Sequence, residues 1–92
     1  MIRSFRSREV ETLYKELRPS KALRSLAKQA VRRLQQLDSA THLRDLALPG
    51  NQLEKLRGDR RDQHGIRING QYRICFRWKD GDAYDVEIVD YH

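Results

Sequence analysis

The stretch Leu56–Trp78, LRGDRRDQHGIRINGQYRICFRW, decides the fold class of this chain. Its second half alternates apolar and polar residues on both sides of Asn69-Gly70, a dipeptide typical of a tight turn between antiparallel strands. The segment is also basic, because eight Lys or Arg residues and only two acidic residues lie between positions 55 and 79. Like charges side by side on a sheet repel each other. Such an array indicates a bound anion, and the common large anion is a nucleic-acid backbone.

The alternation also predicts the register of this hairpin. A two-residue loop would place Ile66 opposite Arg73, which puts isoleucine and arginine on one face of the sheet. We therefore predict a loop of odd length or a bulge, which pairs Ile66 with Ile74 and places Arg67 across from Arg73. His64 then faces the core side, where it is expected to be structural. The predicted apolar face holds Ile66, Ile68, Tyr72, Ile74, Phe76 and Trp78.

A last strand is predicted from about residue 84 to the C-terminus. In the simplest antiparallel register, Arg77 opposes Asp85 and Arg73 opposes Val89. Tyr91 then lies diagonally from Arg73, a separation that long side chains bridge. One polar face is therefore expected to carry Arg67, Arg73 and Tyr91. The residues of this strand predicted to join the core face are Tyr84, Val86 and Ile88.

The first half of the chain predicts two helices. Ser7 can cap a helix over residues 8–17, and Pro19-Ser20 separates it from an amphipathic helix over residues 21–37. A membrane-surface role for the second, basic helix is an alternative, but core packing explains the same pattern. With an edge strand at 2–5 and a short strand at 52–57, the order is β-α-α-β-β-β-β. We predict an α+β fold in which two helices pack on one face of a mainly antiparallel sheet.

Composition narrows the classes of protein. Ninety-two residues make one domain, over residues 1–92, with a small core. No apolar run approaches the length of a membrane span and the start lacks a signal-peptide core, so we expect a cytoplasmic protein with no membrane partner. Cys75 is the only cysteine and no spacing suggests zinc, so no metal or other cofactor is expected. The last thirteen residues carry five acidic and no basic side chains, which indicates a patterned site rather than a general polycation.

Four segments, in their order and spacing, resemble the HigB-type toxins of the RelE/ParE superfamily, the toxin half of bacterial toxin–antitoxin pairs. The resemblance spans nearly the whole chain. It implies a ribosome-dependent endoribonuclease that cleaves translated mRNA and so inhibits growth. It also implies a cognate HigA-type helix-turn-helix antitoxin, through which the complex would reach operator DNA. The four segments are Ile2-Arg3-Ser4-Phe5, Leu56-Arg57-Gly58-Asp59-Arg60, Tyr72-Arg73-Ile74-Cys75-Phe76 and Asp90-Tyr91-His92.

The resemblance also implies which residues form the site. It matches Arg73 and the terminal Asp90, Tyr91 and His92 to the site, and it matches a basic position to Arg57. Some relatives have a histidine where this chain has Glu54, so the general base is not assigned to one residue.

Metal-free RNA cleavage needs a base for the 2′-hydroxyl, cations for the phosphorane and an acid for the leaving oxygen. We assign phosphate stabilisation to Arg73, stacking to Tyr91 and orientation to Asp90. Proton transfer falls to His92 or Glu54. The predicted RNA contacts are Lys55, Arg57, Arg60 and Arg67.

Two other functions stay open at this point. One is a non-enzymatic toxin on the same scaffold, such as the ParE branch that targets DNA gyrase, and the other is a simple nucleic-acid or partner-binding module. The site residues also have structural readings, in which Arg67 and Arg73 are solvated, Arg77 pairs with Asp85 and the terminal tripeptide is a frayed tail. The tyrosine and histidine beside an arginine favour the ribonuclease, because a binder has no need for that cluster.

Overall fold

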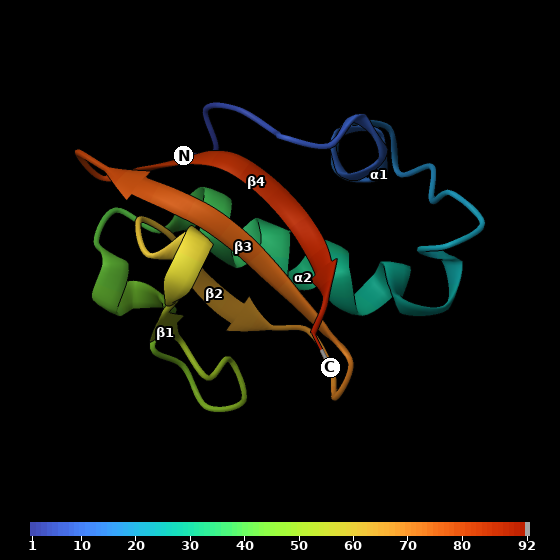
Figure 1. The fold of residues 1–92 in the computed structure, drawn as a ribbon. Helices are drawn as coiled ribbons and strands as arrows, with labels where there is room; N and C mark the ends of the chain where they lie inside the picture. The colour runs from blue at the N-terminus through green and yellow to red at the C-terminus, as the bar shows by residue number, and fades with distance from the viewer. Residues whose placement is uncertain (92) are drawn as a thin grey trace.

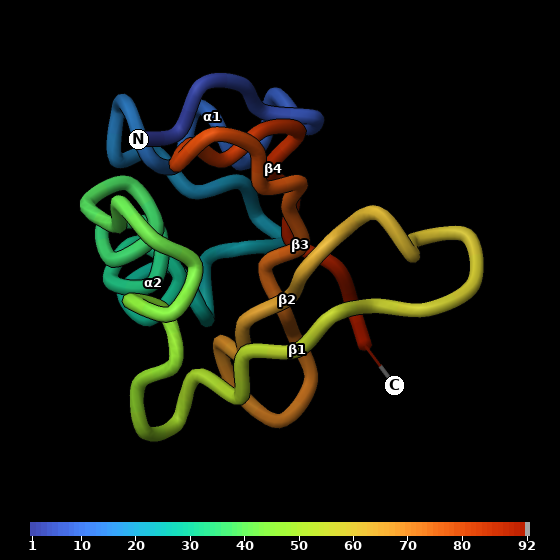
Figure 2. Tube along the Cα trace, turned by 90° about the vertical axis from the view of Figure 1, so that its left-hand side faces the viewer, coloured from blue at the N-terminus to red at the C-terminus, as the bar shows by residue number. Residues whose placement is uncertain are grey.

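A computed structural model describes residues 1–91 of the chain. Its strands form one antiparallel sheet in the order β1-β2-β3-β4. Helix α2 crosses one face of this sheet, and α1 packs against α2 and β4 (Figures 1 and 2). The α+β fold predicted from the sequence is confirmed. The elements are α1 (Arg8–Glu16), α2 (Ala27–Ser39), β1 (Glu54–Lys55), β2 (His64–Arg67), β3 (Tyr72–Lys79) and β4 (Asp82–Asp90), with 3₁₀ turns at Arg24–Leu26, Leu43–Leu46 and Gly58–Arg60.

The first helix begins at its serine cap, as expected, but the bounds of both helices differ from the prediction. The Ser7 hydroxyl accepts a hydrogen bond from the Val10 N–H at 3.4 Å and caps α1. The helix ends one residue early because Leu17 adopts a left-handed conformation, φ +55°. The second helix, expected from residue 21, starts as a 3₁₀ turn and becomes α-helical only at Ala27. Leu26 interrupts it with φ −114° and ψ 6°.

The hairpin register is confirmed. Ile66 pairs with Ile74, and Arg67 lies across from Arg73. On the predicted apolar face, Tyr72 and Trp78 are partly buried against the core, and the other four residues are buried: Ile66, Ile68, Ile74 and Phe76. The helices α1 and α2 contribute five further residues to this core. Their buried residues are Val10, Leu13, Ala30, Leu34 and Leu37.

Strand β4 differs from the prediction because it contains a bulge. Asp85 has φ +53°, and the register with β3 shifts between Cys75 and Arg77. Tyr84, expected on the core face, is therefore opposite Arg77, and Ala83 takes the buried position instead. Arg77 and Asp85 are not opposed as predicted, although their side chains still form an ion pair at 3.4 Å.

Two short strands were overestimated from the sequence. Residues 2–5 make only isolated parallel bridges to β4, from Ile2 to Ala83 and from Phe5 to Val86. The bulge interrupts the ladder between them, where the Ser4 hydroxyl accepts a hydrogen bond from the Asp85 N–H at 2.9 Å. The strand expected at 52–57 is limited to β1, two residues long. None of the helices within residues 1–91 is long and apolar enough to span a bilayer.

Asp38 on α2 ties the N-terminal segment and α1 to the rest of the fold. Its carboxylate accepts hydrogen bonds from the Ile2 N–H at 2.8 Å and from the Tyr14 hydroxyl at 2.7 Å. Burial and this carboxylate together raise the pKa of Tyr14 to about 12.

We expect Tyr14→Phe to lower the free energy of unfolding in urea by about 1 kcal/mol at pH 7, because a part-buried hydrogen bond is lost. The folded pKa of about 12 lies above the ordinary value of 10.0, so this stabilisation is complete below pH 10 and is lost as the pH rises toward 12. The difference in the free energy of unfolding between wild type and Tyr14→Phe should therefore become smaller over that pH range. Equal stability at pH 7, or a Tyr14 phenol that titrates near pH 10 by ultraviolet absorbance, would contradict this account.

Candidate active site on the open face of the sheet

The face of the sheet turned away from α2, called the open face below, is centred on Arg73. This residue follows the buried-face residue Tyr72 and precedes the fully buried Ile74, so its side chain points to the opposite side of β3. Arg67 on β2 and Val89 on β4 flank it. The Arg73 side chain is only 14% exposed, which places a permanent positive charge in a partly desolvated position.

Two other predicted catalytic side chains, Tyr91 and Glu54, contact Arg73. The guanidinium carbon lies 4.6 Å from the centre of the Tyr91 ring, within the range of a cation–π contact. Nη1 of Arg73 lies 3.5 Å from Oε1 of Glu54 on β1. The Tyr91 hydroxyl donates to the same Glu54 oxygen at 3.3 Å, which closes a triangle of three side chains from three separate segments.

The end of β4 is held in place by the β2–β3 hairpin. The Tyr91 N–H donates to the Gln71 carbonyl at 2.6 Å and so continues the β3–β4 ladder past Asp90. The Gln71 amide in turn donates to the Asp90 carboxylate at 3.1 Å. Asp90 and Tyr91 are therefore not a frayed tail. His92, the other terminal residue predicted for the site, lies outside the residues that the structure describes.

Tyr91 lines two hollows that together include all four predicted RNA contacts. The first, of about 300 Å³, lies at the hairpin end and includes Arg67, whose Nε donates to the Asn69 carbonyl at 3.0 Å. The second, of about 410 Å³, lies beside β1 and includes Lys55 and Arg57, both exposed. An extended polyanion that crosses Tyr91 would therefore meet cations on both sides.

Arg60, also a predicted RNA contact, has a carboxylate partner inside the protein. Its Nη1 lies 2.9 Å from Oε2 of Glu87 on β4 and 3.1 Å from the side-chain oxygen of Gln63. The hydrogen bond to Glu87 raises the pKa of Arg60. Arg6 lies 3.6 Å from the same Glu87 oxygen. Arg60 therefore ties the loop after Arg57 to the middle of the sheet.

The remaining polar candidates have structural surroundings. Cys75 is fully buried and burial raises the pKa of its thiol, which opposes thiolate formation. His64 stacks on Phe76 with ring centres 6.2 Å apart, and burial lowers the pKa of its imidazole, so it is neutral at pH 7. Arg77 forms the ion pair with Asp85 that its structural interpretation predicted, and it forms a second ion pair with Asp62. Within residues 1–91, no three His, Cys, Asp or Glu side chains gather so that they could hold a metal ion.

One residue at the site has no counterpart in the sequence analysis. Gln52 presents its backbone carbonyl to Nη1 of Arg73 at 3.4 Å and its side-chain oxygen to Nη2 at 3.2 Å. Nothing in the local sequence signals this contact, since glutamine is common in loops and the segment lies outside every motif.

Comparison with known proteins places these residues in a family. The family model of HigB-like toxins, described as RelE-like toxins of the type II toxin–antitoxin system HigB, matches residues 3–92. The chain belongs to this family. Toxin HigB-1 of Vibrio cholerae serotype O1 is 35% identical over 85 residues, which cover 90% of each chain. Endoribonuclease HigB of Proteus vulgaris is 32% identical over 92 residues, which cover all of both chains.

The fold also matches a more distant structure. The solved YoeB–YefM complex from Staphylococcus aureus contains a chain that superposes with a TM-score of 0.58 over 100% of this chain and 98% of its own length. The sequence identity is 17%, so this match concerns the fold alone. The α+β arrangement of this HigB-family chain is therefore shared beyond recognisable sequence similarity.

The contact between Tyr91 and Arg73 can be tested without any assumption about function. Because protons above an aromatic ring are shielded, the guanidinium proton signals of Arg73 should lie upfield in the NMR spectrum of the wild-type protein. Tyr91→Leu should remove this shift, while Tyr91→Phe should retain it, since only the hydroxyl bond to Glu54 is lost. Identical Arg73 shifts in all three proteins would contradict the contact.

Proposed function

We propose that this HigB-family toxin, acting as one domain in the cytoplasm, is a ribosome-dependent endoribonuclease that cleaves translated mRNA. The observation that carries the proposal is the convergence of Arg73, Glu54 and Tyr91 on the open face, between two hollows lined by cations. The relative named Endoribonuclease HigB, similar over its whole length, supports the same activity. The reaction is attack of a 2′-hydroxyl on the adjacent phosphodiester, with no metal or cofactor in the proposed roles.

Arg73 is the group that stabilises the phosphorane in this mechanism. A guanidinium donates two parallel hydrogen bonds to phosphate oxygens, and its partial burial strengthens them relative to water. In the structure Glu54 lies at the hydrogen-bonding edge of this guanidinium. A phosphate that binds Arg73 would displace the carboxylate by a small movement, since the Glu54 side chain is 43% exposed.

Glu54 and the terminal residues divide the proton transfers. An ionised carboxylate only accepts hydrogen bonds, so the displaced Glu54 is the proposed acceptor of the 2′-hydroxyl proton. We assign protonation of the leaving 5′-oxygen to His92, and Asp90 beside it would orient that end of the chain. Tyr91 offers a ring face for stacking, already used by Arg73 on one side.

The basic residues around the site would guide the RNA backbone. Lys55 and Arg57 line the hollow on one side of Tyr91, and Arg67 lines the hollow on the other. We propose that these three contact phosphates on either side of the cleaved bond. Arg60 would contribute to RNA binding indirectly, because its ion pair with Glu87 holds the loop that follows Arg57.

We expect Arg73→Ala to lower ribosome-dependent RNA cleavage by at least about 100-fold, because one preorganised charge is removed from the transition state. Deletion of Tyr91-His92 should likewise abolish cleavage and growth arrest. Cleavage is measured by mapping RNA ends on translating ribosomes, with circular dichroism and thermal melting as checks of the fold. Arg77→Ala is the matched control, because Arg77 lies on the same strand but pairs with Asp62 and Asp85.

The outcomes separate the three function classes. Wild-type toxicity in both site variants would refute the assignment of the site. Intact messages together with DNA damage would indicate a gyrase-directed toxin, and harmless overexpression would indicate a binding module.

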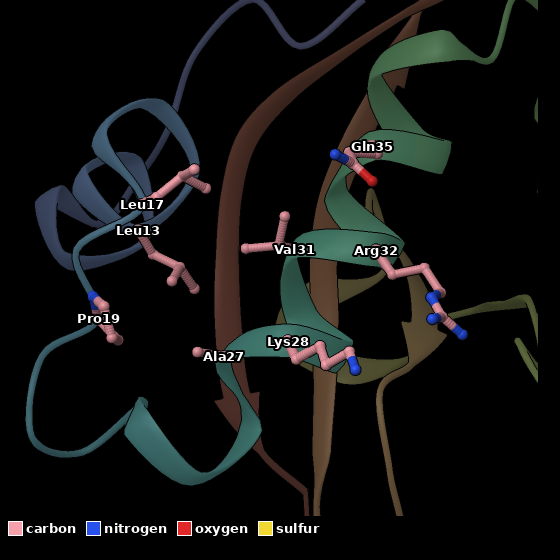
Figure 3. A pocket seen from close by; sticks show the side chains of 8 residues that line it. All are labelled: Leu13, Leu17, Pro19, Ala27, Lys28, Val31, Arg32 and Gln35. Atoms are coloured by element: carbon pink, nitrogen blue, oxygen red, sulfur yellow. The ribbon is translucent and has the colours of Figure 1, made fainter.

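We propose that the partner is a HigA-type helix-turn-helix antitoxin, which docks in the hollow between α1 and α2. Figure 3 shows Leu13 and Leu17 pointing from the α1 side toward Val31 on α2. Leu17 is 68% exposed and lines this hollow together with the buried Leu13. Lys28 and Arg32 on α2 line the same hollow, of about 490 Å³. This chemistry fits an antitoxin segment with apolar side chains flanked by Asp or Glu, and the bound antitoxin would bring the complex to operator DNA.

Leu17→Glu should weaken antitoxin binding about tenfold or more in titration calorimetry, because it places a charge in the apolar contact and repels an acidic segment. The ribosome-dependent cleavage of mRNA should stay at the wild-type level, since Leu17 is not on the open face. Leu48→Glu serves as the control, because Leu48 is another exposed large apolar residue, 43% exposed, outside this hollow. An unchanged dissociation constant for Leu17→Glu would exclude this docking site.

A further inference from the structure

The loop before β1 holds one residue in an unusual backbone conformation beside the site. Gln52 has φ +45°, in the left-handed region that few residues other than glycine and asparagine adopt. Such residues persist only where the surrounding structure fixes them, and they occur often at functional sites. Two features fix Gln52: the segment before it and the guanidinium it contacts.

The segment before Gln52 is anchored through Asn51, which is fully buried. The Asn51 amide donates to the side-chain oxygen of Gln36 on α2 at 2.9 Å and to the Leu46 carbonyl at 3.0 Å. The backbone carbonyl of Asn51 accepts a hydrogen bond from the Arg67 N–H at 2.6 Å. The loop is therefore tied to the helix below the sheet and to β2, the neighbour of β3, and it has little freedom to move relative to Arg73.

The left-handed conformation turns both oxygens of Gln52 toward one group. The backbone carbonyl lies 3.4 Å from Nη1 of Arg73, and the side-chain oxygen lies 3.2 Å from Nη2. The two contacts fall on different nitrogens, so they fix the plane of the guanidinium as well as its position. Tyr91 covers one face of that plane at 4.6 Å.

We propose that Gln52 is a positioning residue for Arg73, which holds the guanidinium in the orientation that receives the scissile phosphate. The inference rests on the proposed ribonuclease function. An amide suits this role because its oxygen orients the guanidinium without cancelling the positive charge. A carboxylate at the same place would bring a negative charge next to the phosphate site and compete with the substrate.

Gln52 has little to do for the fold itself, which makes the proposal testable. Its side chain is exposed, and the buried anchor of the loop is Asn51. Glycine adopts positive φ at no steric cost, so Gln52→Gly should leave the melting temperature unchanged or raise it. A purely structural residue would lose stability and activity together, whereas a positioning residue loses only activity.

The experiment compares Gln52→Gly and Gln52→Glu with wild type in ribosome-dependent RNA cleavage. We expect Gln52→Gly to melt no lower than wild type and to cleave about 10- to 100-fold more slowly, since a displaced catalytic group costs rate rather than stability. Gln52→Glu keeps the size and the acceptor oxygen but should also cleave slowly and need a higher RNA concentration. Asp80→Gly is the matched control, because Asp80 has φ +51° in the β3–β4 turn, and it should cleave like wild type.

A second measurement follows Arg73 without any RNA. Rotation of the Arg73 guanidinium, read from nitrogen-15 NMR, should be slow in wild type and fast in Gln52→Gly. Slow rotation in both proteins, or wild-type cleavage by both Gln52 variants while Arg73→Ala is inactive, would overturn the positioning role and leave the proposed function standing. If Arg73→Ala also cleaves like wild type, the proposed function fails, and the rotation measurement alone decides whether Gln52 holds Arg73.

Discussion

The side chain of Asn69 sets the register on which the whole open face depends. Its Oδ1 accepts hydrogen bonds from the N–H groups of Gln71 at 2.8 Å and Tyr72 at 2.9 Å, which closes the turn between β2 and β3. Side chains alternate along a strand, so a slip of one residue here would turn Arg73 into the core and Ile74 into water. The position of the guanidinium is therefore decided at the turn and not at the site.

From that register the site is assembled by neighbours of β3. Strand β4 runs antiparallel beside it and delivers Tyr91 next to Arg73, while β1 delivers Glu54 from the other side across β2. The helices contribute indirectly, because α2 holds Asn51 through Gln36 and so fixes the loop that carries Gln52. The contacts to the guanidinium thus come from two distant parts of the chain, residues 52–54 and Tyr91 after β4, and both depend on the same sheet.

The parts that sequence predicted are those governed by local periodicity. The alternation of apolar and polar residues in β2 and β3 was sufficient to predict that Arg67 lies across from Arg73. The predicted antiparallel pairing of β3 and β4 then placed Tyr91 near Arg73. Two features that the sequence did not predict are the bulge at Asp85 and the turn at Gln52, both with positive φ. Their causes are tertiary. Ser4 holds the Asp85 N–H from the other end of the chain, and a buried asparagine anchors the loop of Gln52, so no local pattern carries either signal.

The second half of the chain, residues 51–92, holds as many acidic as basic residues and still forms a basic site. The pairing of charges on the sheet explains how. Three acidic residues of β4 form ion pairs with arginines other than Arg73: Asp82 with Arg3 at 3.1 Å, Asp85 with Arg77 at 3.4 Å and Glu87 with Arg60 at 2.9 Å. Close to Tyr91 the acceptors on Arg73 are instead the two neutral oxygens of Gln52 and the exposed carboxylate of Glu54. Among residues 1–91, Glu54 is the carboxylate that forms an ion pair with Arg73, and its side chain is 43% exposed. The charge of Arg73 is therefore balanced by an exposed group, although residues 51–92 as a whole are neutral.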